Sequence, residues 1–411
     1  MKPDSPVTSS LPIPPGAAEN RVWKPRDTGY HSRNELRRQT GEYSSSVTPE
    51  IVSWNPRLSS ALSADVEDAA RALVDFDSYA LRVLGVDSPA VGPMSAILLR
   101  TESASSSQIE NLTTSARQIA LAEIEETVKP NALTVIGNVR AMEAALALSE
   151  SIDRAAILAM HRELLSRQRG WEEHAGVFRS ELVWIGKSRA GPLGADFVAP
   201  QHERVGAAID DLIAFADRDD LPVLVQVAVA HAQFESVHPF VDGNGRTGRA
   251  LAQAMLKNKG LVSHTTVPIS AGLLTQTEVY FGALERFRAG DAAPIVESFA
   301  WASRYAAATG RGLIDRLSEQ LESSRSHLRG IRSDAAAWGV LPRLIAQPML
   351  NTQYLRSALG MSTMTAQRAL EVLTDRGVLK ETTGLRRNRV WQHTGILGVL
   401  DQYADDIRRG R

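Results

Sequence analysis

The sequence predicts a mainly helical protein with one or two small β-hairpins and a C-terminal winged helix–turn–helix region. Three observations carry this prediction. Apolar residues recur at helical spacing through most of the chain, runs of β-branched and aromatic residues are rare, and helix, turn, helix and hairpin signals follow one another near the C-terminus. The 411 residues are 43% hydrophobic and 23% charged, which allows two or three domains with well-packed cores.

Helical periodicity and turn residues place the individual elements. The clearest strand signal is the run 181–186, which a Gly/Pro-bearing turn separates from 197–200, so a hairpin is predicted there. From about Leu58 the spacing is helical, and a Gly/Pro stretch over 85–93 interrupts it. Further helices are predicted over 119–127, 132–149, 152–165, 202–216, 222–237, 245–257 and 278–288.

Five regions follow from this pattern. The first is rich in proline and poor in large apolar groups, so we expect an arm that is disordered or lies on another surface. The expected regions are an arm over 1–45, an N-terminal helical region over 46–130, a helical catalytic core over 131–310, a helical linker over 311–340 and a winged helix–turn–helix over 341–411.

Composition excludes several classes of function. Because the chain has no cysteine, it has no disulfide, no thiol nucleophile and no Cys-ligated metal. Lys and Arg total 46 against 47 for Asp and Glu, so bulk charge does not drive nucleic-acid binding, although local basic patches remain. No run of about 18 apolar residues occurs and the N-terminus lacks a secretory pattern, so we expect a cytoplasmic protein that makes no membrane contact.

The C-terminal region carries a local net charge of +5, with eight basic and three acidic residues over 341–390. One short helix is expected over 351–359, and a second follows whose apolar face consists of Ala366, Ala369, Leu370 and Leu373. Two uses stay open: dimerisation or domain packing, and DNA binding. The DNA contacts would be made by Thr363, Thr365, Gln367 and Arg368 near a groove, and by Arg386, Arg387 and Arg389 on phosphates.

The segment that carries chemistry is His238–Arg249, with the sequence HPFVDGNGRTGR. A long apolar helix is expected to end at Pro239, two glycines flank Asn244, and a new helix begins at about Gly245. Glycines at such a place let successive backbone N–H groups turn toward one point at a helix N-terminus. The segment therefore predicts an anion-binding site.

Four side chains around this turn suit phosphoryl or nucleotidyl transfer. Arg246 and Arg249 lie three residues apart on the expected helix and can reach the same anion. Asp242 can hold a Mg²⁺ that bridges phosphate oxygens. His238 titrates near neutral pH and can take a proton from an incoming hydroxyl.

Three other interpretations of the segment stay open. The glycine pattern G-x-G-x-x-G from Gly243 is typical of dinucleotide binding, but it follows a helix and no acidic residue lies about 20 residues further on. His231, Glu235 and His238 share a helical face and can hold a metal, although such histidines more often lie in a core. The turn can also be a simple connection between helices.

HPFVDGNGRTGR resembles the signature H-P-F-x-D/E-G-N-G-R-x-x-R of the Fic (Fido) family at every defined position. The resemblance implies a Fic-type helical core with a β-hairpin flap over the site. It also implies transfer of AMP from Mg-ATP to a Ser, Thr or Tyr hydroxyl of a target protein, with automodification as a further expectation. His238 is implied as the base and Asp242 as the Mg²⁺ ligand, and the implied phosphate-binding residues are Gly243, Asn244, Gly245, Arg246 and Arg249.

The resemblance extends to the flap and to an adenine site. Residues 176–179 and the run that follows are similar to the family's flap, whose backbone pairs with an extended target segment. Tyr280 and Phe281 resemble the family's aromatic pair near the adenine, with core packing as the alternative. Arg288 stands eight residues after the first aromatic, where relatives usually carry Asn. The implied flap residues are Val183, Trp184, Ile185 and Gly186.

The segment from Ser106 to Asn111, SSQIEN, resembles the inhibitory motif S/T-x-x-x-E-G/N of one Fic class. The resemblance implies that Glu110 forms a charge-assisted pair with Arg249 and occupies the arginine that the γ-phosphate needs. The chain would then be mostly autoinhibited. In some relatives this glutamate also assists removal of AMP.

Two other functions stay open. One is a transcriptional regulator whose core only senses a nucleotide, and the other is a transferase that uses UTP or GTP or that removes AMP. The intact His238 argues against the sensor, because a sensor needs the anion site but no base. A homodimer is a candidate assembly.

Overall fold

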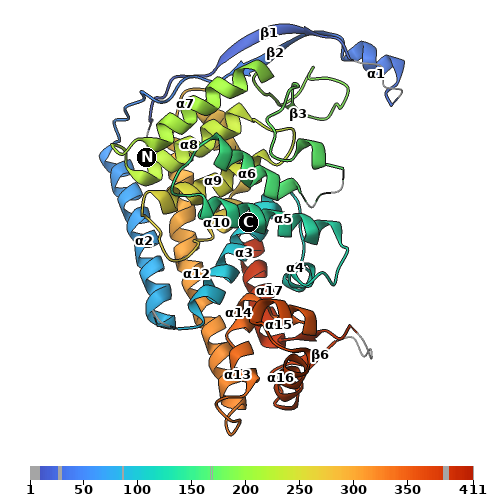
Figure 1. Ribbon diagram of the computed structural model, residues 1–411. Coiled ribbons are helices and arrows are strands. Elements are labelled where there is room, and N and C mark those ends of the chain that lie inside the picture. Colours follow the sequence, from blue (N-terminus) through green and yellow to red (C-terminus); the bar gives the residue numbers. More distant parts are fainter. Residues whose placement is uncertain are drawn as a thin grey trace, which may run out of the picture. The chain divides into compact units, whose positions relative to one another are not determined.

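The structure, a computed structural model, describes residues 10–25, 30–85, 88–166, 168, 170–382 and 388–410 (Figure 1). These residues form a mainly helical fold with a few short strands, which confirms the predicted fold class. No helix in this part of the chain has the length and apolar character needed to cross a membrane.

The α-helices are α1 (Arg33–Arg38), α2 (Ser60–Leu84), α3 (Val91–Ile109), α4 (Ala116–Glu123), α5 (Pro130–Ala147), α6 (Arg154–Leu165), α7 (Val205–Asp217), α8 (Val223–Val237), α9 (Asn244–Asn258), α10 (Ile269–Thr275), α11 (Thr277–Arg288), α12 (Ala293–His327), α13 (Ala336–Val340), α14 (Arg343–Ala346), α15 (Thr352–Leu359), α16 (Thr363–Asp375) and α17 (Thr394–Arg409). Short 3₁₀ turns occupy Glu172–His174 and His202–Arg204. The strands are β1 (Ala17–Trp23), β2 (Gly41–Val47), β3 (Trp184–Ile185), β4 (Phe197–Val198), β5 (Met349–Leu350), β6 (Lys380–Glu381) and β7 (Trp391–Gln392).

The chain divides into two compact units that each combine distant parts of the sequence. Their limits fall within α2, α5, α11 and α12 and directly after α9, and the expected boundary at 310/311 also lies inside α12. The first unit comprises Met1–Asp68, Ala144–Lys259 and Glu278–Ala300, and the second comprises Ala69–Glu143, Gly260–Thr277 and Trp301–Arg411.

Helix α8 forms the core of the first unit. Every residue of α8 after Val223 is buried, as expected for a helix that is apolar or small on all sides. It packs against α7 and α9. Gly248 on α9 lets the two helices α8 and α9 approach closely, because a Cβ there would lie 3.0 Å from Cδ1 of Phe234 on α8. This packing places the end of α8 beside the start of α9.

The described part of the N-terminal segment is ordered. Strands β1 and β2 pair antiparallel over their full length, and both are blue in Figure 1. Leu11 is fully buried, its N–H donates to the Asp291 carboxylate at 3.0 Å, and Nε1 of Trp54 donates to the Pro12 carbonyl at 2.8 Å. Of the two expectations for residues 1–45, an arm that lies on another surface therefore describes residues 10–25 and 30–45.

Helix α3 organises the second unit by packing against α10 and α14. Its buried Glu102 accepts hydrogen bonds from the N–H and Oγ of Ser270, at 2.8 and 2.6 Å. Gly272 brings α10 onto the long helix α12, because a Cβ there would lie 2.5 Å from Cα of Ala302. A carboxylate at the start of α10 is also favourable for the helix dipole.

The C-terminal part of the second unit has the expected order of elements. Helices α15 and α16 are followed by β6 and β7, and β7 lies between β5 and β6 in one antiparallel sheet. The predicted apolar face of α16 is buried, namely Ala366, Ala369, Leu370 and Leu373. The residues expected near a DNA groove are exposed, namely Thr363, Thr365, Gln367 and Arg368.

The three arginines expected on DNA phosphates differ in what the structure says of them. Arg386 and Arg387 lie outside the described residues. Arg389 forms an ion pair with Glu381 and lies 4.8 Å from the centre of the Trp391 ring. The winged-helix assignment and its use in DNA binding or dimerisation stay predictions.

Asn138, on α5, supports the C-terminal end of α3. It is fully buried, and its Nδ2 donates to the Ser103 carbonyl at 2.8 Å and to Oγ of Ser107 at 3.2 Å. We predict that Asn138→Ala lowers the free energy of unfolding by about 1–3 kcal/mol, because buried acceptors lose a donor. Urea unfolding measures this. The exposed Asn131 on the same helix provides the control variant Asn131→Ala, which should change stability by less than about 0.5 kcal/mol; equal losses would contradict the prediction.

Candidate active site

His238 directly follows α8, and its left-handed backbone ends that helix, with φ 49° and ψ 61°. Such a conformation is strained for a residue with a side chain, and it persists only where the surroundings hold it. The N–H of His238 still donates to the Phe234 carbonyl at 2.9 Å. Pro239 has no N–H and cannot continue the helix. The imidazole is therefore held at the C-terminal end of a fully buried helix.

Asn244 closes the turn between α8 and α9. Its Oδ1 accepts the N–H of Phe240 and its Nδ2 donates to the Phe240 carbonyl, both at 2.9 Å. Gly243 has a left-handed φ of 78°, and a Cβ there would lie 2.6 Å from Cδ2 of Leu164. The turn thus requires both residues. The amide side chain of Asn244, expected at the phosphates, is committed to shaping the turn.

His161, on α6, supports the same turn and is a residue that the sequence analysis missed. Its buried ring stacks on Phe240 with the ring centres 3.6 Å apart. Nε2 lies 3.0 Å from the Asp242 carbonyl, and Nδ1 accepts the N–H of Gly176 at 3.0 Å, so the proton belongs on Nε2. Burial lowers the pKa of His161 to about 4, and the ring is neutral at pH 7. A lone histidine within an apolar helix was its only signal in the sequence.

Asp242 and Arg246 form an ion pair, with Oδ2 and Nη2 2.9 Å apart. Arg246 is buried, and its Nε and Nη1 have no hydrogen-bond partner among the described residues. Buried donors without acceptors are costly, and a phosphate oxygen is the kind of acceptor that relieves this cost. Arg249 is also buried on α9. The start of α9 therefore fits the phosphates of a nucleotide.

A magnesium ion fits this site only together with phosphates. The described residues contain no group of three or more His, Asp or Glu side chains that could hold a metal. Asp242 has a 40% exposed side chain and offers a carboxylate, a ligand that Mg²⁺ prefers. Mg²⁺ is commonly held by one or two carboxylates and by substrate phosphates. Asp242 is thus suited to a Mg²⁺ that arrives with the nucleotide.

The His238 ring lies between Glu235 and Phe197. Nδ1 is 3.3 Å from the Glu235 carbonyl and 4.0 Å from its Oε2, and the centre of the Phe197 ring is 6.0 Å away. A proton on Nδ1 donates to that carbonyl and leaves Nε2 as the acceptor. The side chain is 17% exposed, so a substrate hydroxyl can reach it.

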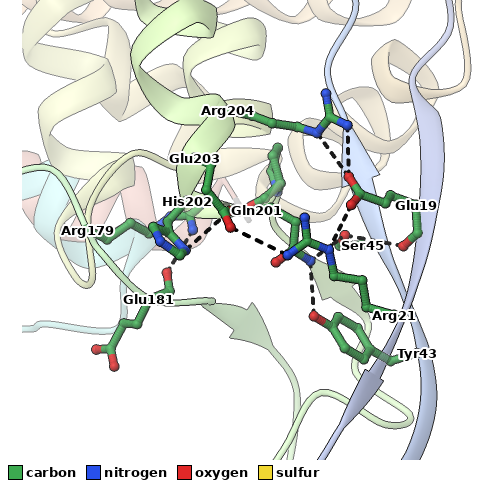
Figure 2. Close-up of polar contacts among 11 residues, drawn as sticks. Glu19, Arg21, Tyr43, Ser45, Arg179, Glu181, Gln201, His202, Glu203 and Arg204 are labelled. Atoms are coloured by element: carbon green, nitrogen blue, oxygen red, sulfur yellow. Dashed lines mark hydrogen bonds and ion pairs between the residues drawn. The ribbon is translucent and has the colours of Figure 1, made fainter.

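Arg179 connects the turn after α8 to the hairpin. Its Nε donates to the His238 carbonyl at 2.8 Å, and its backbone N–H donates to the Pro239 carbonyl at 3.0 Å. Nη1 donates to the Glu181 carbonyl at 2.8 Å and Nη2 to the Pro200 carbonyl at 2.6 Å; Figure 2 shows Arg179 beside Glu181. Burial lowers the pKa of Arg179 to about 10, so the group stays charged at neutral pH. Its positive charge also favours the C-terminal end of α8.

Strands β3 and β4 form the predicted hairpin, which we call the flap and define as residues 181–200. Trp184 pairs with Val198, and Ile185 pairs with Phe197. The chain leaves β3 tightly, because a Cβ at position 186 would lie 2.8 Å from Cα of Ala195. All four expected flap residues lie in its first arm: Val183, Trp184, Ile185 and Gly186.

The two residues expected near the adenine differ in burial. Tyr280 is buried, and its hydroxyl is 2.8 Å from Nε2 of His231, which corresponds to the core-packing alternative. Phe281 is 45% exposed. The guanidinium of Arg288 lies 4.0 Å from the centre of the Phe197 ring, so the end of α11 contacts the flap through Arg288.

Ser106 and Glu110 lie at the C-terminal end of α3, in the second unit. Ser106 is fully buried, whereas Glu110 is exposed and donates its N–H to the Ser107 carbonyl at 3.1 Å. Asn111 is left-handed, with φ 61°, and closes the helix end. The expected pair of Glu110 with Arg249 of the first unit stays a prediction.

Two family models match the chain. The Fic/DOC family model matches residues 151–256, which include α6, the flap, α8 and the turn at His238. The Fic/DOC family N-terminal model matches residues 63–147, which include α3 and Glu110. Residues 63–147 and 151–256 therefore belong to the Fic/DOC family.

Parts of the chain are similar, at modest identity, to curated proteins named as protein adenylyltransferases. The chain is 28% identical over 172 residues to "Protein adenylyltransferase fic-1" of Caenorhabditis briggsae, covering 42% of this chain and 30% of that protein. It is 33% identical over 115 residues to "Protein adenylyltransferase Fic" of Nematostella vectensis, covering 27% and 24%. It is 28% identical over 176 residues to "Probable protein adenylyltransferase aq_aa38" of Aquifex aeolicus, covering 40% and 50%. The chain thus spans at most half the length of these three relatives.

Among solved structures, the chain is similar to a Fic family protein from Desulfovibrio desulfuricans G20, with 24% identity and a TM-score of 0.45. That similarity covers 79% of this chain and 96% of the other.

His161 gives the folded chain a defined dependence on pH. Its pKa of about 4 in the folded state lies below the unfolded value of about 6.5, so the unfolded chain binds more protons between these pH values. Stability therefore falls as the pH falls through this window. We predict that wild type loses about 2 kcal/mol more unfolding free energy than His161→Gln between pH 7 and pH 5.

Urea unfolding of both proteins at the two pH values measures this difference. The exposed His264 provides the control variant His264→Gln, which should follow wild type. Equal losses in wild type and His161→Gln would show that His161 is not protonated on unfolding.

Proposed function

We propose that the chain is a protein adenylyltransferase, which moves AMP from Mg-ATP to a hydroxyl side chain of a target protein. The observation that carries the proposal is that one turn brings a candidate base and a candidate anion site close together. His238 presents Nε2 at the end of α8, and the buried guanidinium of Arg246, at the start of α9, has two donor nitrogens with no acceptor among the described residues. The printed names of the curated relatives agree with this activity.

In the proposed reaction, His238 takes the proton from the target hydroxyl while that oxygen attacks the α-phosphorus. A new phosphorus–oxygen bond forms to the target, the bond from the α-phosphorus to the oxygen bridging to the β-phosphate breaks, and pyrophosphate leaves. Arg246 and Arg249 bind the β- and γ-phosphates and offset the charge that develops on them. Asp242 would hold Mg²⁺, which supplies further neutralisation of the phosphates.

The flap is proposed to receive the target. Within the described residues, β3 pairs only with β4, so its outer edge can add one more extended strand. Ile185 is 49% exposed, which leaves an apolar contact for such a segment. The flap lies beside the base, because Phe197 on β4 contacts the His238 ring edge-on. A Ser, Thr or Tyr in the added strand would thus come near Nε2.

We also propose that Glu110 inhibits the enzyme by pairing with Arg249. A charge-assisted pair would remove one of the two arginines that the leaving phosphates need. Stabilisation of the inhibited state by a few kcal/mol lowers the active population about 100-fold. The buried Asn138 donates hydrogen bonds to the last turns of α3, so the backbone that carries Glu110 is held in place.

Transfer from ATP labelled at either the α- or the γ-phosphate tests both proposals. We predict label on protein from α-labelled ATP alone, raised on the order of 100-fold by Glu110→Gly and lost in Glu110→Gly/His238→Ala. The control is Glu125→Gly, which removes another exposed glutamate at a helix end and should behave as wild type.

Each other outcome points elsewhere. Label from γ-labelled ATP would make the chain a kinase. Label only from UTP or GTP, tested in parallel, would change the nucleotide, and loss of AMP from premodified protein would show removal. Absence of label in every variant despite ATP binding would contradict the proposal and favour a nucleotide sensor.

A further inference from the structure

Two side chains of the N-terminal segment hold the tip of the flap, and the proposed mechanism does not use either of them. Trp23, the last residue of β1, donates from Nε1 to the Ala190 carbonyl at 2.9 Å. Gln39, which follows α1, makes a reciprocal pair with Leu193, in which Nε2 donates to the carbonyl and Oε1 accepts the N–H, both at 3.0 Å. Gln39 is only 9% exposed, so this pair is largely shielded from water.

The loop and the two side chains fit each other closely. The rings of Trp23 and Trp184 meet edge to face, with centres 5.5 Å apart and planes at 72°. At Gly191, an added Cβ would lie 2.5 Å from Nε1 of Trp23 and 2.7 Å from Oε1 of Gln39. The position therefore requires glycine while both side chains are in place. This fit is independent of the hydrogen bonds and points to the same contact.

The antiparallel pair β1–β2 also contacts the residues that directly follow the flap. Gln201, directly after it, is buried and donates from Nε2 to the Tyr43 hydroxyl at 3.0 Å and to Oγ of Ser45 at 2.8 Å. Arg204 donates to the Glu19 carboxylate at 3.0 Å. Figure 2 shows these side chains reaching between β1, β2 and the segment 201–204. The pair β1–β2 thus contacts both the tip of the flap and the residues that follow it.

We propose that Trp23 and Gln39 are positioning residues that hold the flap ready for the target, so that residues 17–25 and 30–47 form part of the target-docking apparatus. This inference rests on the proposed transfer to a protein. A two-stranded hairpin is marginally stable alone, and the flap has only two paired residues in each strand. Its position therefore depends on contacts from outside. A flap that is held in advance loses less freedom when the target binds.

Limited digestion with trypsin of the full-length chain tests whether the flap is held. Lys187 and Arg189 are exposed trypsin sites in the loop between β3 and β4. We expect cleavage at these two sites to rise about tenfold in Trp23→Phe, which keeps the ring but removes the N–H, and in Gln39→Leu. Gly191→Ala changes the flap instead, and its Cβ should displace both side chains and raise cleavage by a similar factor.

The control is Val22→Ala, next to Trp23 on β1, where the side chain is 61% exposed. It should be cleaved at the wild-type rate, and urea unfolding should show that all four variants remain folded under the conditions of digestion. Cleavage of the flap at the wild-type rate in the three flap-contact variants would overturn the inference.

Transfer kinetics test the docking role. In a Glu110→Gly background, label from α-labelled ATP is followed on a tagged His238→Ala chain that serves as the protein target. We expect Gln39→Leu to raise KM for this target about tenfold while KM for ATP and kcat change less than about twofold. Equal changes in both KM values, or a change in kcat alone, would overturn the docking role. Absence of label with the Glu110→Gly chain would contradict the proposed function. The trypsin result would still decide whether Trp23 and Gln39 hold the flap.

Discussion

The buried guanidinium of Arg179 holds together the two segments on which the site depends. It donates to the carbonyl of His238 at the end of α8 and to the carbonyls of Glu181 and Pro200 at the two ends of the flap. Without the guanidinium, the buried Pro200 carbonyl would lose this donor, and an unsatisfied buried polar group costs about 1–3 kcal/mol. The strained left-handed backbone of His238 and the two ends of the flap therefore share one supporting side chain.

Around this connection, the first unit builds the site from both sides. His161 and Asn244 shape the turn that is proposed to bind a nucleotide, and neither contact involves a charged group. On the other side, Trp23 and Gln39 fix the tip of the flap. The hydrogen bonds of His161, Asn244, Trp23 and Gln39 thus join uncharged groups, and salt disturbs such contacts little.

Much of the fold could be predicted because its signals are local. The apolar character of α8 and the apolar face of α16 are visible in the sequence and match the buried residues. The β1–β2 pair was missed because β2 is mostly polar, as in the run Ser44–Ser46, and neither strand shows an alternation of apolar and polar residues. The order of the N-terminal segment depends on a few distant contacts, such as that of Leu11 with Asp291, which no local pattern reveals.

The site divides in the same way. The turn from His238 to Arg249 is continuous in the sequence, so its residues could be named as a set. Their partners from other elements could not, because the support from His161 and the burial of Tyr280 against His231 arise only when separate helices pack. The sequence thus shows which groups can react, and the tertiary structure shows what orients them.

The central claim is that Arg179 fixes the flap and the turn after α8 together. Hydrogen–deuterium exchange of the full-length chain, compared between wild type and Arg179→Gln, tests it most directly. The account predicts that backbone amides of 181–200 and of 238–245 exchange faster together in the variant, while amides of the second unit keep their wild-type rates. Faster exchange in only one of the two segments, or in neither, would contradict it.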